Sequence, residues 1–149
     1  MDNDSKISIF VMSNNDKKDM EKIKVTVDWL DNYGAVSEQI PGCVATDKTY
    51  EGIKEAYISA VEFHLEGLKS DEVPECLNGR YEFEFELTTR ALLHQLDGVL
   101  SRATISRATG INEKQLQHYL SGYRKARPDK REKIISAVHS IGKELLSVV

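Results

Sequence analysis

Apolar and polar residues alternate along two stretches of the chain, which indicates two β-strands that each bury one face. The first stretch is residues 22–29, where the apolar positions are Ile23, Val25, Val27 and Trp29. The second is residues 81–87, where the apolar positions are Tyr81, Phe83, Phe85 and Leu87. Successive side chains of a strand point to opposite faces, so both stretches fit a sheet covered on one side.

Turn residues and a helical spacing fill the segment between these strands. The residues "LDNYG" predict a turn, and residues 34–40 are expected to return as the hairpin partner of the first strand. Residues 43–45 are expected to form a short third strand after Pro41-Gly42. Thr49 is placed to cap a helix from Tyr50 to about Leu68. Its predicted buried stripe is Ile53, Ala56, Tyr57, Ala60 and His64.

From Arg90 onward the apolar spacing is helical throughout, and Pro128 suits the first turn of the last helix. The chain therefore divides into a polar tail (1–21), an α+β domain (22–88) and an all-helical domain (90–149). The predicted fold class is α+β, with a small antiparallel sheet covered by one helix. Within the tail, Ile7–Met12 is either an added edge strand or merely a sticky segment, and we assign it no function.

Gly110 interrupts two short helical runs in the segment "RATISRATGINEKQLQHYLSG". A glycine there ends a helix in the left-handed conformation, and Ile111 follows as an apolar plug. Asn112 and Gln115 form a potential capping box for the next helix, which Gly122 ends. This spacing predicts a helix-turn-helix whose second helix, residues 112–121, has the size and polar front to enter a DNA major groove.

The 149 residues, 40% hydrophobic and 30% charged, are typical of a folded globular protein. No apolar run approaches the roughly 20 residues of a membrane helix, and the first residues are acidic where a secretory signal would be basic. We therefore expect a cytoplasmic protein without a membrane partner. Cys43 and Cys76 are too few and too far apart for a disulfide framework or a zinc site, so no metal or cofactor is predicted.

The net charge of −4 is unevenly distributed along the chain. Residues 1–89 hold 19 acidic residues against 9 Lys and Arg, and residues 90–149 hold 5 against 11. We expect the basic half to bind a polyanion and the acidic half to bind a basic partner. The alternative is that the charged side chains only form a solvated surface.

Double-stranded DNA is the predicted polyanion. The residues expected to face base edges are Lys114, Gln115, Gln117 and His118, although His118 is equally well explained as a surface histidine. The residues expected to contact phosphates are Arg102, Arg124, Lys125 and Arg127. One short recognition helix reads few base pairs, so a homodimer or higher even oligomer is expected.

Both domains resemble known families. The helical segment is similar to the Cro and phage-repressor helix-turn-helix family at Ser106, Gly110, Ile111, Leu116, Tyr119 and Gly122. The α+β segment resembles the HicB antitoxin family at Pro41-Gly42-Cys43, Thr49, Glu51, Ala56, Ala60, Val61 and Leu65. Asp47 and Gly52 depart from that pattern, because family members commonly have glycine and alanine there.

The HicB resemblance implies a partial ribonuclease H-like fold and a partner, a small basic HicA-type toxin that cleaves messenger RNA. It would make the chain an antitoxin that represses its own operon. The candidate toxin-binding residues, chosen because turns and strand ends project outward, are Asp31, Asn32, Glu38 and Asp47. The row Glu82, Glu84 and Glu86 is a further candidate, unless it is only a solvated strand face.

Two other functions stay open at this point. One is a stand-alone transcription regulator whose first domain senses a small ligand. The other is a two-metal nuclease built from Asp28, Asp31, Glu38 and Asp47, but these carboxylates form no recognisable spacing and no catalytic residues are predicted. His64, His94 and His139 lie in helical patterns and are expected to be packing residues.

Overall fold

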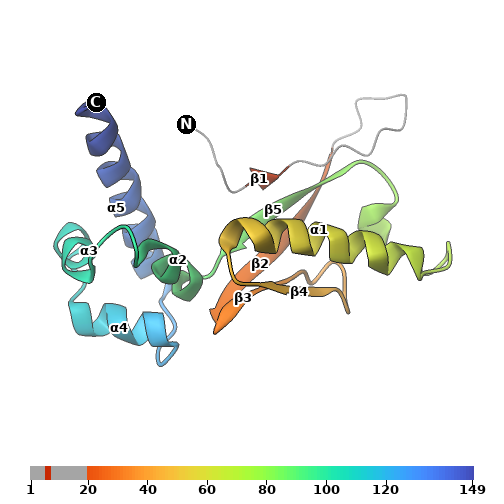
Figure 1. Ribbon diagram of the computed structural model, residues 1–149, viewed down its shortest axis with the longest axis horizontal. Helices are drawn as coiled ribbons and strands as arrows, with labels where there is room; N and C mark the ends of the chain where they lie inside the picture. Colours follow the sequence, from red (N-terminus) through yellow and green to blue (C-terminus); the bar gives the residue numbers. More distant parts are fainter. Residues whose placement is uncertain (1–5, 8–19) are drawn as a thin grey trace. The chain divides into compact units, whose positions relative to one another are not determined.

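The structure is a computed structural model that describes residues 6–7 and 20–149. The chain separates into two compact units, Met1–Thr88 and Thr89–Val149. The first unit contains a sheet and one long helix, and the second is entirely helical (Figure 1).

The sheet of the first unit has the strand order β1-β5-β2-β3-β4. Its strands are β1 (Lys6–Ile7), β2 (Glu21–Leu30), β3 (Asn32–Val36), β4 (Val44–Asp47) and β5 (Tyr81–Leu87). Ile7 thus belongs to an edge strand, and residues 8–12 of the predicted edge segment lie outside the described residues.

The prediction of an antiparallel sheet is wrong for its centre. β2, β3 and β4 form the expected antiparallel meander, but β5 runs parallel to β2, with Ile23 opposite Phe83. The reason lies in the connection. Helix α1 (Tyr50–Glu66) carries the chain across one face of the sheet, and a strand that returns after such a crossover runs parallel to its neighbour.

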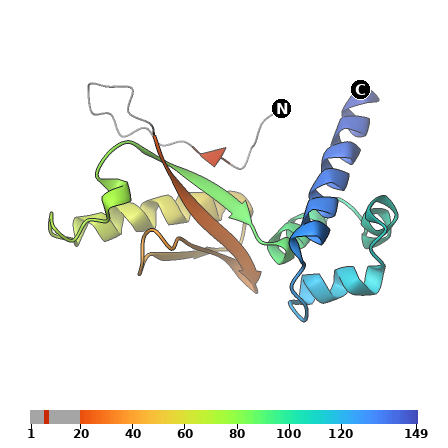
Figure 2. The ribbon, with the colours of Figure 1, turned by 180° about the vertical axis from the view of Figure 1, so that it is seen from behind.

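One face of the sheet packs against α1, which lies in front of the strands in Figure 1 and behind them in Figure 2. The alternating residues of β2 and β5 point into this layer, and Tyr57 of α1 meets Phe83 and Phe85 edge-on. The residues of α1 that become buried are Ile53, Lys54, Tyr57 and Val61. The predicted stripe is therefore correct at Ile53 and Tyr57, whereas Ala56, Ala60 and His64 are only half-buried.

The hairpin between β2 and β3 is tighter than "LDNYG" predicts. Asp31 alone connects the two strands and adopts φ 64°, a left-handed conformation that Asp tolerates better than most residues. Asn32 and Tyr33 consequently belong to β3 rather than to a turn, and β3 ends at Val36 instead of Ile40. The third strand covers residues 44–47 instead of 43–45.

The second unit contains four helices: α2 (Thr89–Leu96), α3 (Arg102–Thr109), α4 (Glu113–Ser121) and α5 (Pro128–Ser147). They share one apolar core made of Leu93, Ile105, Ile111, Leu116, Tyr119 and Ile134. Ile111 fills the space between α3 and α4 and is 2% exposed, as the apolar plug predicted.

Gly110 and Gly142 provide a matched test of backbone conformation. A Cβ atom at either position would meet nothing within 4 Å, but Gly110 has φ 74° whereas Gly142 lies inside α5. We expect Gly110→Ala to lower the free energy of unfolding by about 1 kcal/mol, because a side chain is strained in the left-handed region. Gly142→Ala should raise it by about 0.5–1 kcal/mol, because alanine favours the helix. Urea denaturation of both variants measures the difference, and equal signs would contradict this explanation.

Of the helices in the part of the chain that the structure describes, none has both the length and the apolar composition needed to cross a membrane.

Candidate nucleic-acid interface

Helix α4 is held at both ends by local hydrogen bonds. The side chain of Asn112 accepts a hydrogen bond from the backbone N–H of Gln115 at 2.8 Å, so the helix begins where the sequence predicts. Gly122 ends it at φ 80°. The predicted capping box is only half formed, because the Gln115 amide does not turn back to Asn112. Its Nε2 donates to the hydroxyl of Tyr119 at 2.7 Å.

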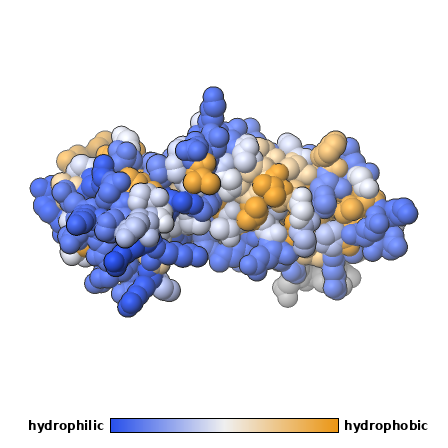
Figure 3. Space-filling model, turned by 90° about the horizontal axis from the view of Figure 1, so that it is seen from below, coloured by the Kyte–Doolittle hydropathy of each residue, from blue (hydrophilic) through white to orange (hydrophobic). Residues whose placement is uncertain are grey.

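The inner face of α4 joins the core of the second unit and its outer face is polar. Leu116 and Tyr119 are 0% and 4% exposed, whereas Glu113, Lys114 and Ser121 are exposed. The surface over α4 is largely hydrophilic (Figure 3). A helix anchored by two buried residues and open on the other side has the arrangement that a groove-reading helix needs.

The four predicted base-reading residues do not have equal access. Lys114 is exposed, while Gln115, Gln117 and His118 are half-buried. Gln115 is joined to Tyr119, and the ring of His118 lies 4.9 Å from that of Tyr123. Gln117 accepts a hydrogen bond from the guanidinium of Arg102. Lys114 is therefore the exposed member of the set, whereas Gln115, Gln117 and His118 each contact another residue of the second unit.

The predicted phosphate-contacting residues fall into two places. Arg124, Lys125 and Arg127, which we call the basic loop, are exposed between α4 and α5. The backbone N–H of Arg124 donates to the carbonyl of His118 at 3.1 Å and ties the loop to the end of α4. Arg102 begins α3 instead, and its guanidinium reaches Gln117.

His94 is the titratable group of α2 whose pKa is displaced. Partial burial lowers the pKa of His94, because the low-dielectric surroundings disfavour the charged imidazolium. This partial burial fits its predicted role as a packing residue. His64 is half-buried and His139 is exposed on α5, so His139 does not have the packing role that the sequence predicted.

The candidate toxin-binding residues of the first unit lie at two ends of β3. Asp31 and Asn32 form the exposed tip of the β2–β3 hairpin, and Asp47 is near them because it pairs with Tyr33 in register. Glu38 follows the opposite end of β3 and is separate from the other three. The hairpin tip also exposes Leu30 to 74%, an apolar residue that the sequence pattern placed at the start of a turn.

The glutamate row of β5 is partly neutralised by the neighbouring strand. Nζ of Lys22 lies 3.3 Å from Oε1 of Glu84, and Nζ of Lys24 lies 2.7 Å from Oε2 of Glu86. Both ion pairs join β2 to β5, its parallel neighbour. Both lysines are exposed and the two glutamates are partly or fully exposed, so the ion pairs contribute little to stability, but they reduce the negative charge that this face presents.

The carboxylates considered for a two-metal site have structural partners. Asp28 accepts hydrogen bonds from the backbone N–H of Trp29 and the hydroxyl of Thr88, at 2.8 and 2.6 Å. Asp47 accepts from the backbone and hydroxyl of Thr49. Within residues 6–7 and 20–149, no group of three or more His, Cys, Asp or Glu side chains could hold a metal ion.

Asp47 and Gly52 meet at the start of α1. Thr49 caps the helix by accepting from the backbone N–H of Gly52 at 2.9 Å, and Asp47 in turn accepts from Thr49. A Cβ atom at position 52 would collide with the Asp47 carboxylate and the Thr49 hydroxyl. Gly52 thus makes room for the Asp47 carboxylate.

A double-mutant cycle tests this coupling. Gly52→Ala alone is expected to destabilise the first unit by about 1 kcal/mol, because the added methyl group displaces the capping side chains. In the Asp47→Ala background the same change should cost less or stabilise, since alanine favours a helix and the carboxylate is gone. Chemical denaturation of the four proteins gives the interaction energy, and simple additivity would show that the two positions are independent.

Comparison of the chain with protein-family models, with curated proteins and with solved structures gave no match.

Proposed function

We propose that this protein is an antitoxin that binds operator DNA through α3 and α4 and neutralises a basic, RNA-cleaving toxin through its first unit. One observation is the main support for the proposed DNA binding. The two-ended capping of α4 holds an exposed polar face next to the three cations of the basic loop. Such an arrangement allows phosphate contacts to position a helix whose side chains read base edges.

Charge supports the assignment of two partners to two units. The net charge is −10 over residues 1–89 and +6 over residues 90–149. Long-range attraction favours association of the basic unit with DNA and of the acidic unit with a basic protein. The HicB-like residues of the first unit supply the kind of protein, a HicA-type toxin. Asp31, Asn32 and Asp47 at the hairpin tip are the first contacts to examine, with Glu38 as a separate one.

DNA binding of this kind calls for two copies. A single α4 spans 9 residues and reaches few base pairs, whereas a two-fold pair reads half-sites one helical turn apart. We therefore propose a homodimer or a higher even oligomer on a palindromic operator.

Co-expression with the product of the neighbouring reading frame tests the proposal as a whole. We expect a stable complex with a short basic protein, suppression of its ribonuclease activity, and specific retention of the upstream DNA fragment in gel shifts. Specific DNA binding without any protein partner would instead favour a stand-alone regulator with a ligand-sensing domain. Magnesium-dependent nuclease activity of the purified chain, lost in Asp28→Asn, would favour the nuclease.

A further inference from the structure

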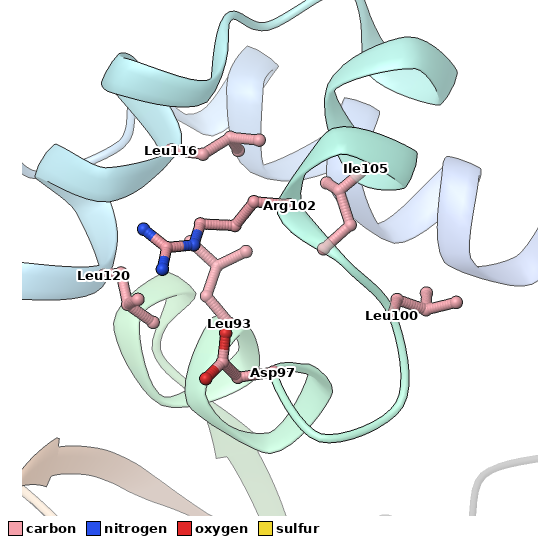
Figure 4. Close-up of a pocket in the computed structure, with 7 residues that line it drawn as sticks. All are labelled: Leu93, Asp97, Leu100, Arg102, Ile105, Leu116 and Leu120. Atoms are coloured by element: carbon pink, nitrogen blue, oxygen red, sulfur yellow. The ribbon is translucent and has the colours of Figure 1, made fainter.

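The side chain of Arg102 links the two helices of the helix-turn-helix, because it contacts Gln117, which lies 15 residues later in the sequence. Arg102 is the first residue of α3, and its Nη1 donates to Oε1 of Gln117 on α4. Figure 4 shows the Arg102 side chain extending toward α4 across a small pocket. The lining of this pocket includes Leu93, Leu116 and Leu120. The aliphatic part of Arg102 thus covers apolar residues while its charged end reaches α4.

This contact fixes which way the Gln117 amide faces. A guanidinium carries only donors, so the Gln117 atom that meets it must be the oxygen. The Nε2 group of Gln117 is then the part of the amide left for another partner. Gln117 is half-buried, and it lies three residues after Lys114 and four before Ser121, both exposed, so it shares their side of α4.

We propose that Arg102 is a positioning residue that makes Gln117 a hydrogen-bond donor toward DNA, and that Gln117 consequently reads guanine. This inference rests on the proposed DNA-binding function. Guanine presents two acceptors, N7 and O6, in the major groove. Adenine presents one acceptor and one donor, and glutamine reads it with both its oxygen and its nitrogen. An oxygen that already faces Arg102 disfavours that pairing. Lys114, an exposed residue three positions earlier on α4, also offers only donors and so matches the same acceptor-rich edge.

The test compares Arg102→Met with Arg107→Met in the full-length chain. Methionine keeps an aliphatic side chain over the leucines but has no guanidinium. Arg107 is an exposed arginine of the same helix, so its replacement removes the same charge. Selection from random duplex DNA gives the preferred sequence of the wild type, and binding to single-base variants of that sequence gives the preference at each position. Gln117→Ala identifies the position that Gln117 reads.

At that position the wild type should prefer guanine over adenine by on the order of tenfold or more, the discrimination of one well-placed contact. Arg102→Met should remove this preference, with adenine gaining relative to guanine, and leave other positions unchanged. Combining it with Gln117→Ala should produce no further loss of preference. Arg107→Met should weaken binding to all sequences alike. If Arg102→Met behaves like Arg107→Met, Arg102 is a phosphate contact and the inference is wrong.

A second measurement needs no DNA. The side-chain amide resonances of Gln117 in a ¹H–¹⁵N spectrum should shift in Arg102→Met and stay in place in Arg107→Met. Specific DNA binding combined with unchanged Gln117 resonances would overturn this inference alone. A wild-type chain that binds no duplex DNA would overturn the proposed function and this reading of guanine together.

Discussion

Replacing the basic loop by glutamine (Arg124→Gln, Lys125→Gln, Arg127→Gln) is expected to weaken binding to duplex DNA by roughly 10²- to 10³-fold at 0.1 M salt. All three side chains are exposed and lie beside the end of α4, where they are placed to contact phosphates. Each phosphate contact releases counterions and contributes about 0.9 to the slope of log K against log salt. Removing three contacts should therefore reduce the slope by about 2.7, equally for specific and nonspecific sequences.

A triple variant with the same change in net charge provides the control. Lys48, Lys69 and Lys143 are exposed, and none belongs to the basic loop or α4. Changing these three residues to glutamine should leave the salt slope nearly unaltered. Affinity is measured by fluorescence anisotropy over a range of salt concentrations. Equal losses in the two triple variants would show that total charge, rather than the basic loop, governs DNA binding.

Leu116→Ala is expected to destabilise the second unit by about 2–5 kcal/mol and to abolish DNA binding at temperatures where that unit unfolds. Leu116 is 0% exposed and packs with Ile105, Tyr119 and the rest of the helical core. Its truncation removes apolar contacts and leaves a cavity beneath the candidate recognition helix.

The single tryptophan of the chain separates the two units in this experiment. Trp29 lies on β2, so its fluorescence follows the first unit, whereas circular dichroism at 222 nm follows mainly the second unit, which contains α2 to α5. Leu116→Ala should shift the circular dichroism transition and leave the Trp29 transition in place. Val99→Ala, at a residue 77% exposed in the second unit, should change stability by no more than about 0.5 kcal/mol. A Trp29 transition that moves together with the helical one would mean that the units unfold cooperatively.

Local spacing was sufficient to predict most elements. The alternation at residues 22–29 and 81–87 corresponds to β2 and β5, and Thr49 caps α1 as expected. Gly110 and Gly122 both adopt the left-handed conformation that ends a helix. These features depend on neighbours within a few residues, and sequence order carries that information directly.

The direction in which the strands pair could not be predicted from the sequence pattern. The parallel arrangement of β2 and β5 depends on where the crossover through α1 returns the chain, and alternation within each strand is the same for either direction. The burial of Lys54 was also missed, since a lysine next to an apolar stripe normally reaches solvent. Its ammonium lies 4.2 Å from the centre of the Tyr50 ring and 3.6 Å from Glu51, and these two neighbours accompany the buried charge.

By itself, the sequence predicted an α+β segment followed by helices, the glycines that end α3 and α4, and the polar outer face of α4 with its neighbouring cations. Only the tertiary structure decided what each polar residue meets. Gln115 turns to Tyr119, Gln117 to Arg102, and Asp47 into the space left by Gly52. The physical reason is that secondary structure follows from the spacing of residues along the chain. A side-chain partner follows from how two elements cross in space, and spacing along the chain does not specify that crossing.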